Sequence, residues 1–428
     1  MEHNIVKAEI ITIGDEILYG QITDTNSQWI GLELANIGIL VVHKKSVGDN
    51  KKAILEGLSE AERRADLILL TGGLGPTKDD ITKNALAEYF GVGMKFHEEI
   101  LEHIRELFRQ RNREHLLEFN RTQAYLPENA IPISNHLGTA PGMWFEKGNK
   151  VFISMPGVPH EMKKMMTDAV LPKIIEKFRP PVIYHHFIRT IGIAESQLSA
   201  QIAEWESQLP SHIKLAYLPR LGQVKLRLTA TGSDKSTLQR ECEILTEKLL
   251  PLIQDYVFAI GEKEIQEVIG EMLKSRGQMV AIAESCTGGY VSHLFTQNPG
   301  SSAYFKGSVV AYHNEVKQHL LGVRAETLSA YGAVSEETAR EMAVGVAQKL
   351  SADFGISITG IAGPEGGTPE KPVGTVWIAC VGPSGEIKTQ KLTLSKDRMM
   401  NIQLSANGVL NLLRQVILSE QNKKTLSF

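Results

Sequence analysis

The residue types that nucleophilic catalysis needs stand together in one short run, Ala283-Glu284-Ser285-Cys286-Thr287-Gly288-Gly289. Ser, Cys and Thr in succession offer three candidate nucleophiles. The run follows an apolar, strand-like segment, Met279 to Ala283, and precedes a stretch that is compatible with a helix. The paired glycines allow the backbone to turn sharply and bring N–H groups close to a developing oxyanion. The pattern therefore predicts a nucleophile on a strand-to-helix turn.

Two later segments supply the remaining parts of such a site. Residues 312–317, Tyr-His-Asn-Glu-Val-Lys, contain a candidate base, and residues 359–364, Thr-Gly-Ile-Ala-Gly-Pro, form a second glycine-rich strand end. Nucleophilic catalysis needs a nucleophile, a base that accepts its proton and donors for the developing oxyanion. Serine with lysine can meet these needs without histidine. We expect the three segments to form one active site.

A second candidate site lies near the N-terminus. Gly14-Asp15-Glu16 follows the first strand-like segment, and residues 71–80, TGGLGPTKDD, follow the third. Glycines and a helix N-terminus at the carboxyl ends of parallel strands favour phosphate, but carboxylates there repel it unless a divalent cation intervenes. The pattern predicts metal-bridged pyrophosphate, although each acid taken alone reads equally well as a helix cap or a solvated side chain. The candidate phosphate-binding residues are Gly72, Gly73, Gly75 and Thr77, and the candidate metal ligands are Asp15, Asp79, Asp80 and Glu161.

Regular alternation of strand-like and helix-like segments positions these residues. From Glu9 to about Phe90 the order is βαβαβα, which predicts a parallel sheet with helical crossovers. A charged helical stretch from Glu98 to Glu118 and a strand at Val151 to Ser154 follow. Residues 182–260 read as an α+β sandwich. An α/β pattern resumes from residue 263, where Ser335 is predicted to cap a helix that runs through Lys349.

Composition narrows the class of protein. At 428 residues, with 42% hydrophobic and 22% charged residues, the chain is expected to form two or three globular domains. Its formal net charge of −3 provides no general attraction for nucleic acid or anionic membrane. Its three scattered cysteines argue against a disulfide scaffold and a structural zinc site. Since neither a signal peptide nor a membrane-spanning apolar run is evident, a cytoplasmic protein without a membrane partner is expected.

Taken together, these motifs resemble those of the CinA family, the competence-damage inducible proteins. AESCTGG, YHNEVK, GAVSEET, SITGIAGPEGG and KPVGTVW are similar to the family's C-terminal domain, and IITIGDEIL, TGGLGPTKDD and MPGVPHEM are similar to its N-terminal domain. The resemblance implies an N-terminal three-layer α/β molybdopterin-binding-like domain over residues 1–180. A middle α+β KH-like module over residues 181–262 and a C-terminal α/β amidohydrolase domain over residues 263–421 complete the expected architecture.

The resemblance also implies two hydrolytic activities. The C-terminal domain would deamidate nicotinamide mononucleotide without a cofactor, with Ser285 as nucleophile, Lys317 as general base and the Tyr312 hydroxyl between or beside them. Because the reference pKa of lysine is about 10.4, such a site must lower the pKa of Lys317. The N-terminal domain would hydrolyse ADP-ribose to AMP and ribose 5-phosphate with a divalent metal. The other candidate substrate-binding residues are Thr287, Gly288, Gly289, Thr359, Gly360, Gly363 and Arg398.

The sequence leaves several alternatives open. Cys286 is a rival nucleophile, although a small buried packing residue is its more ordinary role. A nucleotide- or pterin-binding scaffold protein, associated with competence or recombination and with one or both sites non-catalytic, is the alternative function. The middle segment lacks an evident GXXG loop, so direct nucleic-acid binding is not expected. The family resemblance and the middle module suggest a homo-oligomer, most simply a dimer.

Overall fold

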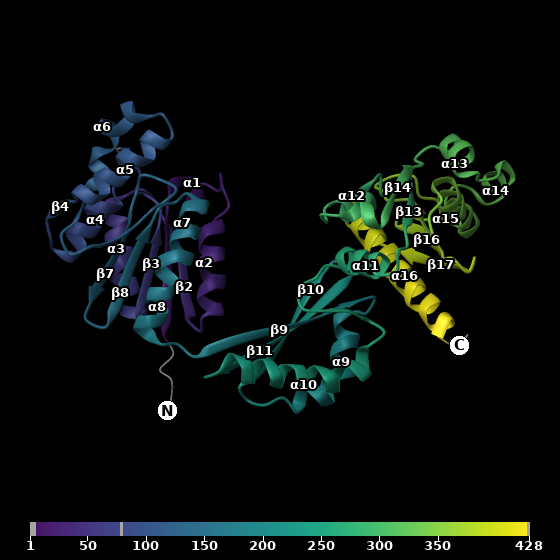
Figure 1. Cartoon of the computed structure of the whole chain (residues 1–428), viewed down its shortest axis with the longest axis horizontal. Coiled ribbons are helices and arrows are strands. Elements are labelled where there is room, and N and C mark those ends of the chain that lie inside the picture. The colour runs from purple at the N-terminus through teal and green to yellow at the C-terminus, as the bar shows by residue number, and fades with distance from the viewer. Residues whose placement is uncertain (1–5, 78–79, 426–428) are drawn as a thin grey trace. The chain divides into compact units, whose positions relative to one another are not determined.

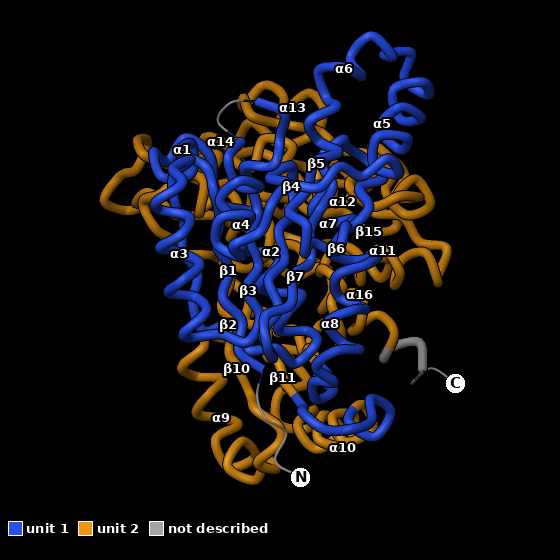
Figure 2. The backbone as a smooth tube through the Cα atoms, turned by 90° about the vertical axis from the view of Figure 1, so that its left-hand side faces the viewer, with its two compact units in different colours: residues 1–184, 230–238 blue, residues 185–229, 239–428 orange. Residues whose placement is uncertain are grey.

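The computed structural model describes residues 6–77 and 80–425 of the chain. Its contacts divide the chain into two units, which Figure 2 colours differently: unit 1 comprises residues 1–184 and 230–238, and unit 2 comprises residues 185–229 and 239–428. Across the described ranges, no helix combines the length and the apolar character needed to cross a membrane.

A mixed sheet of six strands forms the centre of unit 1 (Figure 1). Its strands are β1 (Lys7–Ile13), β2 (Leu40–Val47), β3 (Leu67–Thr71), β6 (Ile131–Ile133), β7 (Gly142–Lys147) and β8 (Lys150–Met155). Their order is β2-β1-β3-β8-β7-β6. The pairs among β2, β1, β3 and β8 are parallel, whereas β8–β7 and β7–β6 are antiparallel. A separate antiparallel pair joins β4 (Met94–Phe96) to β5 (Tyr125–Pro127).

Helices cover both faces of this sheet. They are α1 (Asp15–Leu18), α2 (Thr25–Asn36), α3 (Lys51–Arg64), α4 (Thr82–Phe90), α5 (Glu98–Gln110), α6 (Leu117–Asn120), α7 (Pro159–Met165) and α8 (Leu171–Phe178). Ile10 and Leu69 belong to the core formed with α2, α7 and α8, and their neighbours Ile11 and Ile68 belong to the core formed with α3, α4 and α5. Because successive strand residues point to opposite faces, unit 1 has three layers.

The sequence expectation for unit 1 is confirmed in part and corrected at two helix boundaries. The helix predicted from Glu98 to Glu118 ends at Gln110, because Asn112 adopts a left-handed φ of 54° and the chain continues in short helical turns. The parallel pairing predicted for the βαβαβα segment is confirmed for β1, β2 and β3, whereas β7 and β6, which make the whole sheet mixed, form within a Pro/Gly/Asn-rich passage that gave no strand signal. Helix α4 begins at Thr82, so Asp80 lies in the preceding loop.

The middle part of the chain, most of which belongs to unit 2, is an α+β module. It consists of β9 (Val182–Ile191), α9 (Glu195–Ser207), β10 (Ile213–Arg220), β11 (Gln223–Gly232), α10 (Lys235–Ile253) and β12 (Val257–Ile260). The strands form one sheet in the order β10-β11-β9-β12. The α+β character predicted for residues 182–260 is therefore confirmed, with the succession strand, helix, two strands, helix and strand.

The C-terminal part of unit 2 is an α/β domain, in which helices pack on a central sheet. Its strands are β13 (Val280–Glu284), β14 (Phe305–Val310), β15 (Phe354–Gly360), β16 (Thr375–Val381) and β17 (Ile387–Thr393). Their order is β14-β13-β15-β16-β17. Strand β13 pairs in parallel with β14 and β15, and β16 pairs antiparallel with β15 and β17. Strand β16 lies within the KPVGTVWIACV stretch and is the antiparallel neighbour of β15.

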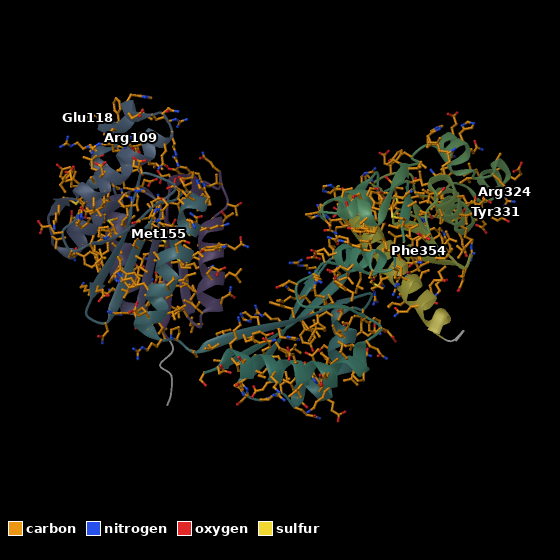
Figure 3. The ribbon with its side chains drawn as sticks, in the orientation of Figure 1. Arg109, Glu118, Met155, Arg324, Tyr331 and Phe354 are labelled. Carbon is orange, nitrogen blue, oxygen red and sulfur yellow. The ribbon has the colours of Figure 1, made fainter. Side chains whose placement is uncertain are left out.

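Helices again cover both faces of the C-terminal sheet. They are α11 (Ile265–Lys274), α12 (Tyr290–Thr296), α13 (Asn314–Leu321), α14 (Ala325–Tyr331), α15 (Glu336–Leu350) and α16 (Arg398–Thr425). Ile282 packs with α11, α12 and α16, whereas Ala281 and Ala283 pack with α15. The Ser335 hydroxyl accepts the N–H of Thr338 at the start of α15, which confirms the predicted cap. Figure 3 shows Phe354 inside this domain and Tyr331 at its surface.

Helix α16 also joins the C-terminal domain to the middle module. Arg414 is buried, and its guanidinium donates to the carbonyls of Asp255 and Val257 at 2.9 and 3.0 Å. About two turns earlier in α16, the Asn407 amide donates to the Leu221 carbonyl at 2.6 Å. Side chains of α16 thus supply hydrogen-bond donors to three backbone carbonyls of the middle module.

Candidate active sites

The predicted nucleophile-bearing turn lies at the carboxyl end of β13. The Ser285 N–H donates to the Ile358 carbonyl of β15 at 2.9 Å, which anchors the start of the turn to the sheet. Gly288 and Gly289 have φ values of 60° and 102°, a region that favours glycine, and α12 begins directly after them. The turn therefore has the expected strand-to-helix geometry.

Lys317 lies against Ser285. Its side chain extends from α13, is 1% exposed, and places Nζ 3.2 Å from Ser285 Oγ. The same nitrogen is 2.8 Å from the Ala311 carbonyl and 3.2 Å from the Tyr312 carbonyl. A neutral amine can donate its two hydrogens to these carbonyls and turn its lone pair toward the Ser285 hydroxyl. This is the arrangement that a general base requires.

Burial favours the basic form of this lysine. Desolvation lowers the pKa of Lys317 below its ordinary value, which is the direction that the sequence argument demanded. The shift comes from removing a charged ammonium from water, and no carboxylate forms an ion pair with Lys317 in the described chain. The geometry and the electrostatics therefore agree.

Cys286 is a poor rival to Ser285 as the nucleophile. Its side chain packs in the core formed with α11, α12 and α16. Burial raises the pKa of the Cys286 thiol to about 12, so the reactive thiolate is disfavoured at neutral pH. The structural-packing reading of this residue is the one that fits its surroundings.

Two of the backbone N–H groups expected to face a substrate already donate hydrogen bonds within the turn. The Gly288 N–H donates to the Ser285 carbonyl at 3.1 Å, and the Gly289 N–H donates to the Glu284 carboxylate at 3.0 Å. Among the described residues, the Thr287 N–H donates no backbone hydrogen bond, so it is the amide of this turn that is best placed to receive an oxyanion. The Thr287 hydroxyl is buried and has no hydrogen-bond partner in the described chain. Such an orphaned hydroxyl is a natural contact for a substrate.

Tyr312 does not lie where the resemblance implied. Its side chain is 61% exposed, and its hydroxyl accepts a hydrogen bond from Arg398 at 3.1 Å instead of lying between Ser285 and Lys317. The contribution of Tyr312 to the buried lysine is its backbone carbonyl. The reason is its position after the end of β14, where the chain leaves the sheet and the side chain points to solvent.

The glycine-rich loop after β15 meets the start of α16. Arg398 donates to the Gly363 carbonyl at 2.8 Å, so it bridges this loop and Tyr312. Thr359 is buried, and its hydroxyl donates to the Ala333 carbonyl at 2.7 Å. Asn401, which the sequence argument missed, is fully buried and donates to the Ala362 carbonyl at 2.9 Å. Nothing in its local sequence distinguishes it from other polar helix residues. Gly360 ends β15 at the base of this loop.

Five of the N-terminal candidate residues line a pocket of about 590 Å³ in unit 1, namely Gly72, Gly73, Gly75, Asp80 and Glu161. The glycine-rich loop after β3 forms one wall, including Gly72, Gly73 and Gly75, and the loop from Pro156 to Pro159 forms another. Both loops follow carboxyl ends of neighbouring parallel strands, so the pocket lies where the sequence predicted it. Four acids also line it, namely Glu16, Asp49, Asp80 and Glu161.

The acids of this pocket differ in part from the expected set. Asp15 does not line the pocket; its N–H donates to the Asp49 carboxylate at 3.1 Å. Asp79 lies outside the described residues. Glu161 accepts a hydrogen bond from Asn135 at 2.7 Å. Asp49 was missed, although its place directly after β2 is the signal that had singled out Asp15 after β1.

Asp80 makes the closest contacts with the glycine-rich loop. Its carboxylate accepts the N–H of Gly75 at 2.7 Å, the N–H of Thr77 at 2.8 Å and the Thr77 hydroxyl at 2.5 Å. It therefore fixes the loop rather than capping α4. Burial, together with repulsion from Asp15, Glu16 and Asp80, raises the pKa of Asp49. Within residues 6–77 and 80–425, no three His, Cys, Asp or Glu side chains form a ready metal-binding group.

Comparisons with known proteins cover the same three parts of the chain. The model described as "Probable molybdopterin binding domain" matches residues 9–176. "Damage-inducible protein CinA KH domain" matches residues 185–259, and "CinA C-terminal domain" matches residues 262–417. A CinA-like protein of Cytophaga hutchinsonii is 48% identical over 410 residues, which cover 96% of this chain and 98% of that protein.

Two further relatives complete the comparison. A CinA-like protein of Flavobacterium psychrophilum is 42% identical over 419 residues, covering 98% of this chain and all of that protein. Among solved structures, the competence/damage inducible protein CihA of Agrobacterium tumefaciens is 35% identical, covers 37% of this chain and 98% of that chain, and has a TM-score of 0.34.

Proposed function

Because the chain belongs to the CinA family, we propose that its C-terminal domain is a metal-independent amidase that converts nicotinamide mononucleotide to nicotinate mononucleotide and ammonia. The observation that carries this proposal is the buried Lys317 amine, 3.2 Å from Ser285 Oγ and held by two backbone carbonyls. A serine activated by a neutral lysine is suited to hydrolysis of a carboxamide.

The proposed reaction runs through an acyl-enzyme. Neutral Lys317 accepts the Ser285 proton while Oγ attacks the carboxamide carbon, and the amide of Thr287 donates to the oxyanion. The resulting Lys317 ammonium then protonates the departing nitrogen, so ammonia leaves and the ester of Ser285 remains. Water, deprotonated by the same amine, attacks this ester, and the proton returns to Ser285 as the carboxylate product leaves.

Arg398 is the proposed anchor for the phosphate of the substrate. Replacing it with alanine is expected to raise KM for nicotinamide mononucleotide by about 10- to 100-fold with a small change in kcat, since a charge-assisted hydrogen bond contributes about 1.5–3 kcal/mol. The matched control is Tyr312→Phe, which removes only the hydroxyl partner of Arg398. Steady-state kinetics of both variants check this, and a large kcat loss with unchanged KM in Arg398→Ala would contradict it.

The direct test of the amidase is ammonia release from nicotinamide mononucleotide by the purified full-length protein, with and without a chelator. Release that persists with the chelator and yields nicotinate mononucleotide is the expected result. No release from folded protein would refute the activity, and release abolished by the chelator would refute its metal independence.

For the N-terminal domain we propose hydrolysis of ADP-ribose to AMP and ribose 5-phosphate. The pocket of unit 1 combines glycine-rich loops, which suit phosphate, with acids that would repel it unless a divalent cation neutralises them. Mg²⁺ usually keeps several waters and takes one or two carboxylates plus substrate phosphates, so the absence of a three-ligand group in the described chain is compatible with it. Asp49 and Asp80 are the residues proposed to hold the cation. The cation would supply charge neutralisation and activate water.

This second activity predicts a selective metal dependence. Chelation, or Asp80→Asn, is expected to reduce AMP release from ADP-ribose by at least about 100-fold while ammonia release from nicotinamide mononucleotide stays unchanged, because a metal supplies several kcal/mol of charge stabilisation. Asp66→Asn is the matched control, since Asp66 precedes β3 at the opposite end and pairs with a backbone N–H. Calorimetric binding of ADP-ribose without any hydrolysis would instead favour the nucleotide- or pterin-binding alternative.

A further inference from the structure

We propose that Glu284 is a positioning residue that holds the Ser285 turn in its reactive shape. This inference rests on the proposed amidase function of the C-terminal domain. Glu284 is the last residue of β13 and is fully buried directly before the proposed nucleophile. A buried carboxylate at such a place requires a compensating arrangement of donors.

The donors come from the far end of the same turn. One oxygen of the Glu284 carboxylate accepts the N–H groups of Gly289 and Val291 at 3.0 and 3.1 Å. The other oxygen accepts the N–H and the hydroxyl of Ser292 at 2.8 and 2.6 Å. Four hydrogen bonds therefore connect the residue before Ser285 to Gly289 and the first turn of α12, so that the segment between them forms a closed loop.

The same hydrogen bonds also stabilise the negative charge of the buried Glu284 carboxylate. No Lys, Arg or His forms an ion pair with Glu284 in the described chain; the carboxylate is instead stabilised by amides at the N-terminus of α12, where the helix dipole favours a negative charge. The protein's own carboxylate thus occupies the position that an external anion would take. These donors are therefore taken by Glu284, and the phosphate of the proposed substrate is assigned to Arg398.

The chemistry explains why glutamate is needed. Both of its oxygens accept, whereas glutamine has one accepting oxygen and an NH₂ group that would face further donors. Glu284→Gln is therefore expected to keep the size of the side chain but to lose one half of the contacts. The loop would relax, and the Ser285 hydroxyl would shift relative to Lys317. A displacement of about 1 Å can reduce turnover by about 100-fold.

The experiment compares Glu284→Gln with Asp353→Asn in the full-length protein. Asp353 provides the matched control because its carboxylate accepts the N–H of Met279 at the opposite end of β13, 2.7 Å away. Hydrogen exchange of the amides of Gly289, Val291 and Ser292, kcat and KM for nicotinamide mononucleotide, and the rate at which a fluorophosphonate labels Ser285 are measured.

We expect faster exchange, a kcat lowered by about 100-fold and KM changed by less than about threefold in Glu284→Gln, with the Asp353→Asn control close to wild type in kcat. Unchanged exchange, or faster exchange with normal kcat, would overturn the proposal. If Glu284→Gln fails to fold, Ser292→Ala removes one contact and is expected to lower kcat and labelling by several-fold; normal values would overturn the proposal.

The labelling rate separates this proposal from the function on which it rests. If wild type is labelled but does not release ammonia, the proposed substrate is wrong, and slower labelling of Glu284→Gln still supports the positioning role. If wild type is neither labelled nor active, Ser285 is not a nucleophile and both proposals fail.

Discussion

Ser285→Ala is expected to reduce ammonia release from nicotinamide mononucleotide by at least about 10⁴-fold, because removal of a nucleophile that acts together with its base eliminates nearly the whole catalytic advantage of the pair. Substrate binding should persist, since Arg398 and the glycine-rich loop after β15 are unaffected. Discontinuous assays of released ammonia measure the decrease in turnover, and calorimetric titration with nicotinamide mononucleotide measures substrate binding.

Cys286→Ala is the matched control for this prediction. Its thiol is buried and its pKa is raised to about 12, so its removal should leave kcat within about threefold of wild type while a small packing defect lowers stability. The assignment fails if the cysteine variant loses turnover and the serine variant keeps it.

Lys317→Met is expected to abolish turnover to a similar degree, by at least about 10³-fold, because no other side chain lies within hydrogen-bonding distance of Ser285 Oγ in the described chain. Methionine fills the space without burying an amine, but it leaves the Ala311 and Tyr312 carbonyls without this donor, so thermal stability is expected to stay close to that of wild type. Loss of activity without a comparable loss of thermal stability would distinguish a catalytic lysine from a structural one.

The pH dependence has a defined sign. Burial lowers the pKa of Lys317, so between the folded pKa and about 10.4 the unfolded chain binds more protons and the free energy of unfolding rises with pH. This gain in the free energy of unfolding is lost as pH falls toward the pKa of Lys317 in the folded protein. In Lys317→Met this part of the pH dependence of stability should be absent. Wild-type kcat should decline on the acid side of the same pKa, because the base becomes protonated. A kcat that rises as pH falls below that pKa would contradict the role of Lys317.

The fold was predictable where periodicity and turn residues agree. The βαβαβα succession of unit 1 and the Ser335 cap of α15 followed from local patterns that act within one element. Strands β6 and β7 were missed because their pairing depends on β8, whereas their own flanking prolines and glycines indicate a loop. Asn112 ended α5 early through a left-handed conformation that charge periodicity does not reveal.

The candidate sites were predictable at the level of segments more than of side chains. The positions of the motifs were enough to predict that Ser285 and Lys317 lie close together. The direction of the Tyr312 side chain was not predictable, because it depends on where the chain leaves the sheet after β14. Glu284 was missed for a related reason: within its strand it reads as one more polar end residue, and its partners become visible only when α12 folds back. Asp49 follows the same rule as Asp15 and could have been found from it.

Helix α16 has a practical consequence for dividing this protein into fragments. Its 28 residues extend for roughly 42 Å, with Arg398 at the candidate site and Arg414 at the contact with the middle module. A fragment cut at the module boundary near residue 262 would leave the Arg414 guanidinium and the Asn407 amide without their carbonyl partners. Domain-swapping or truncation schemes should therefore transfer residues 185–259 together with the C-terminal domain.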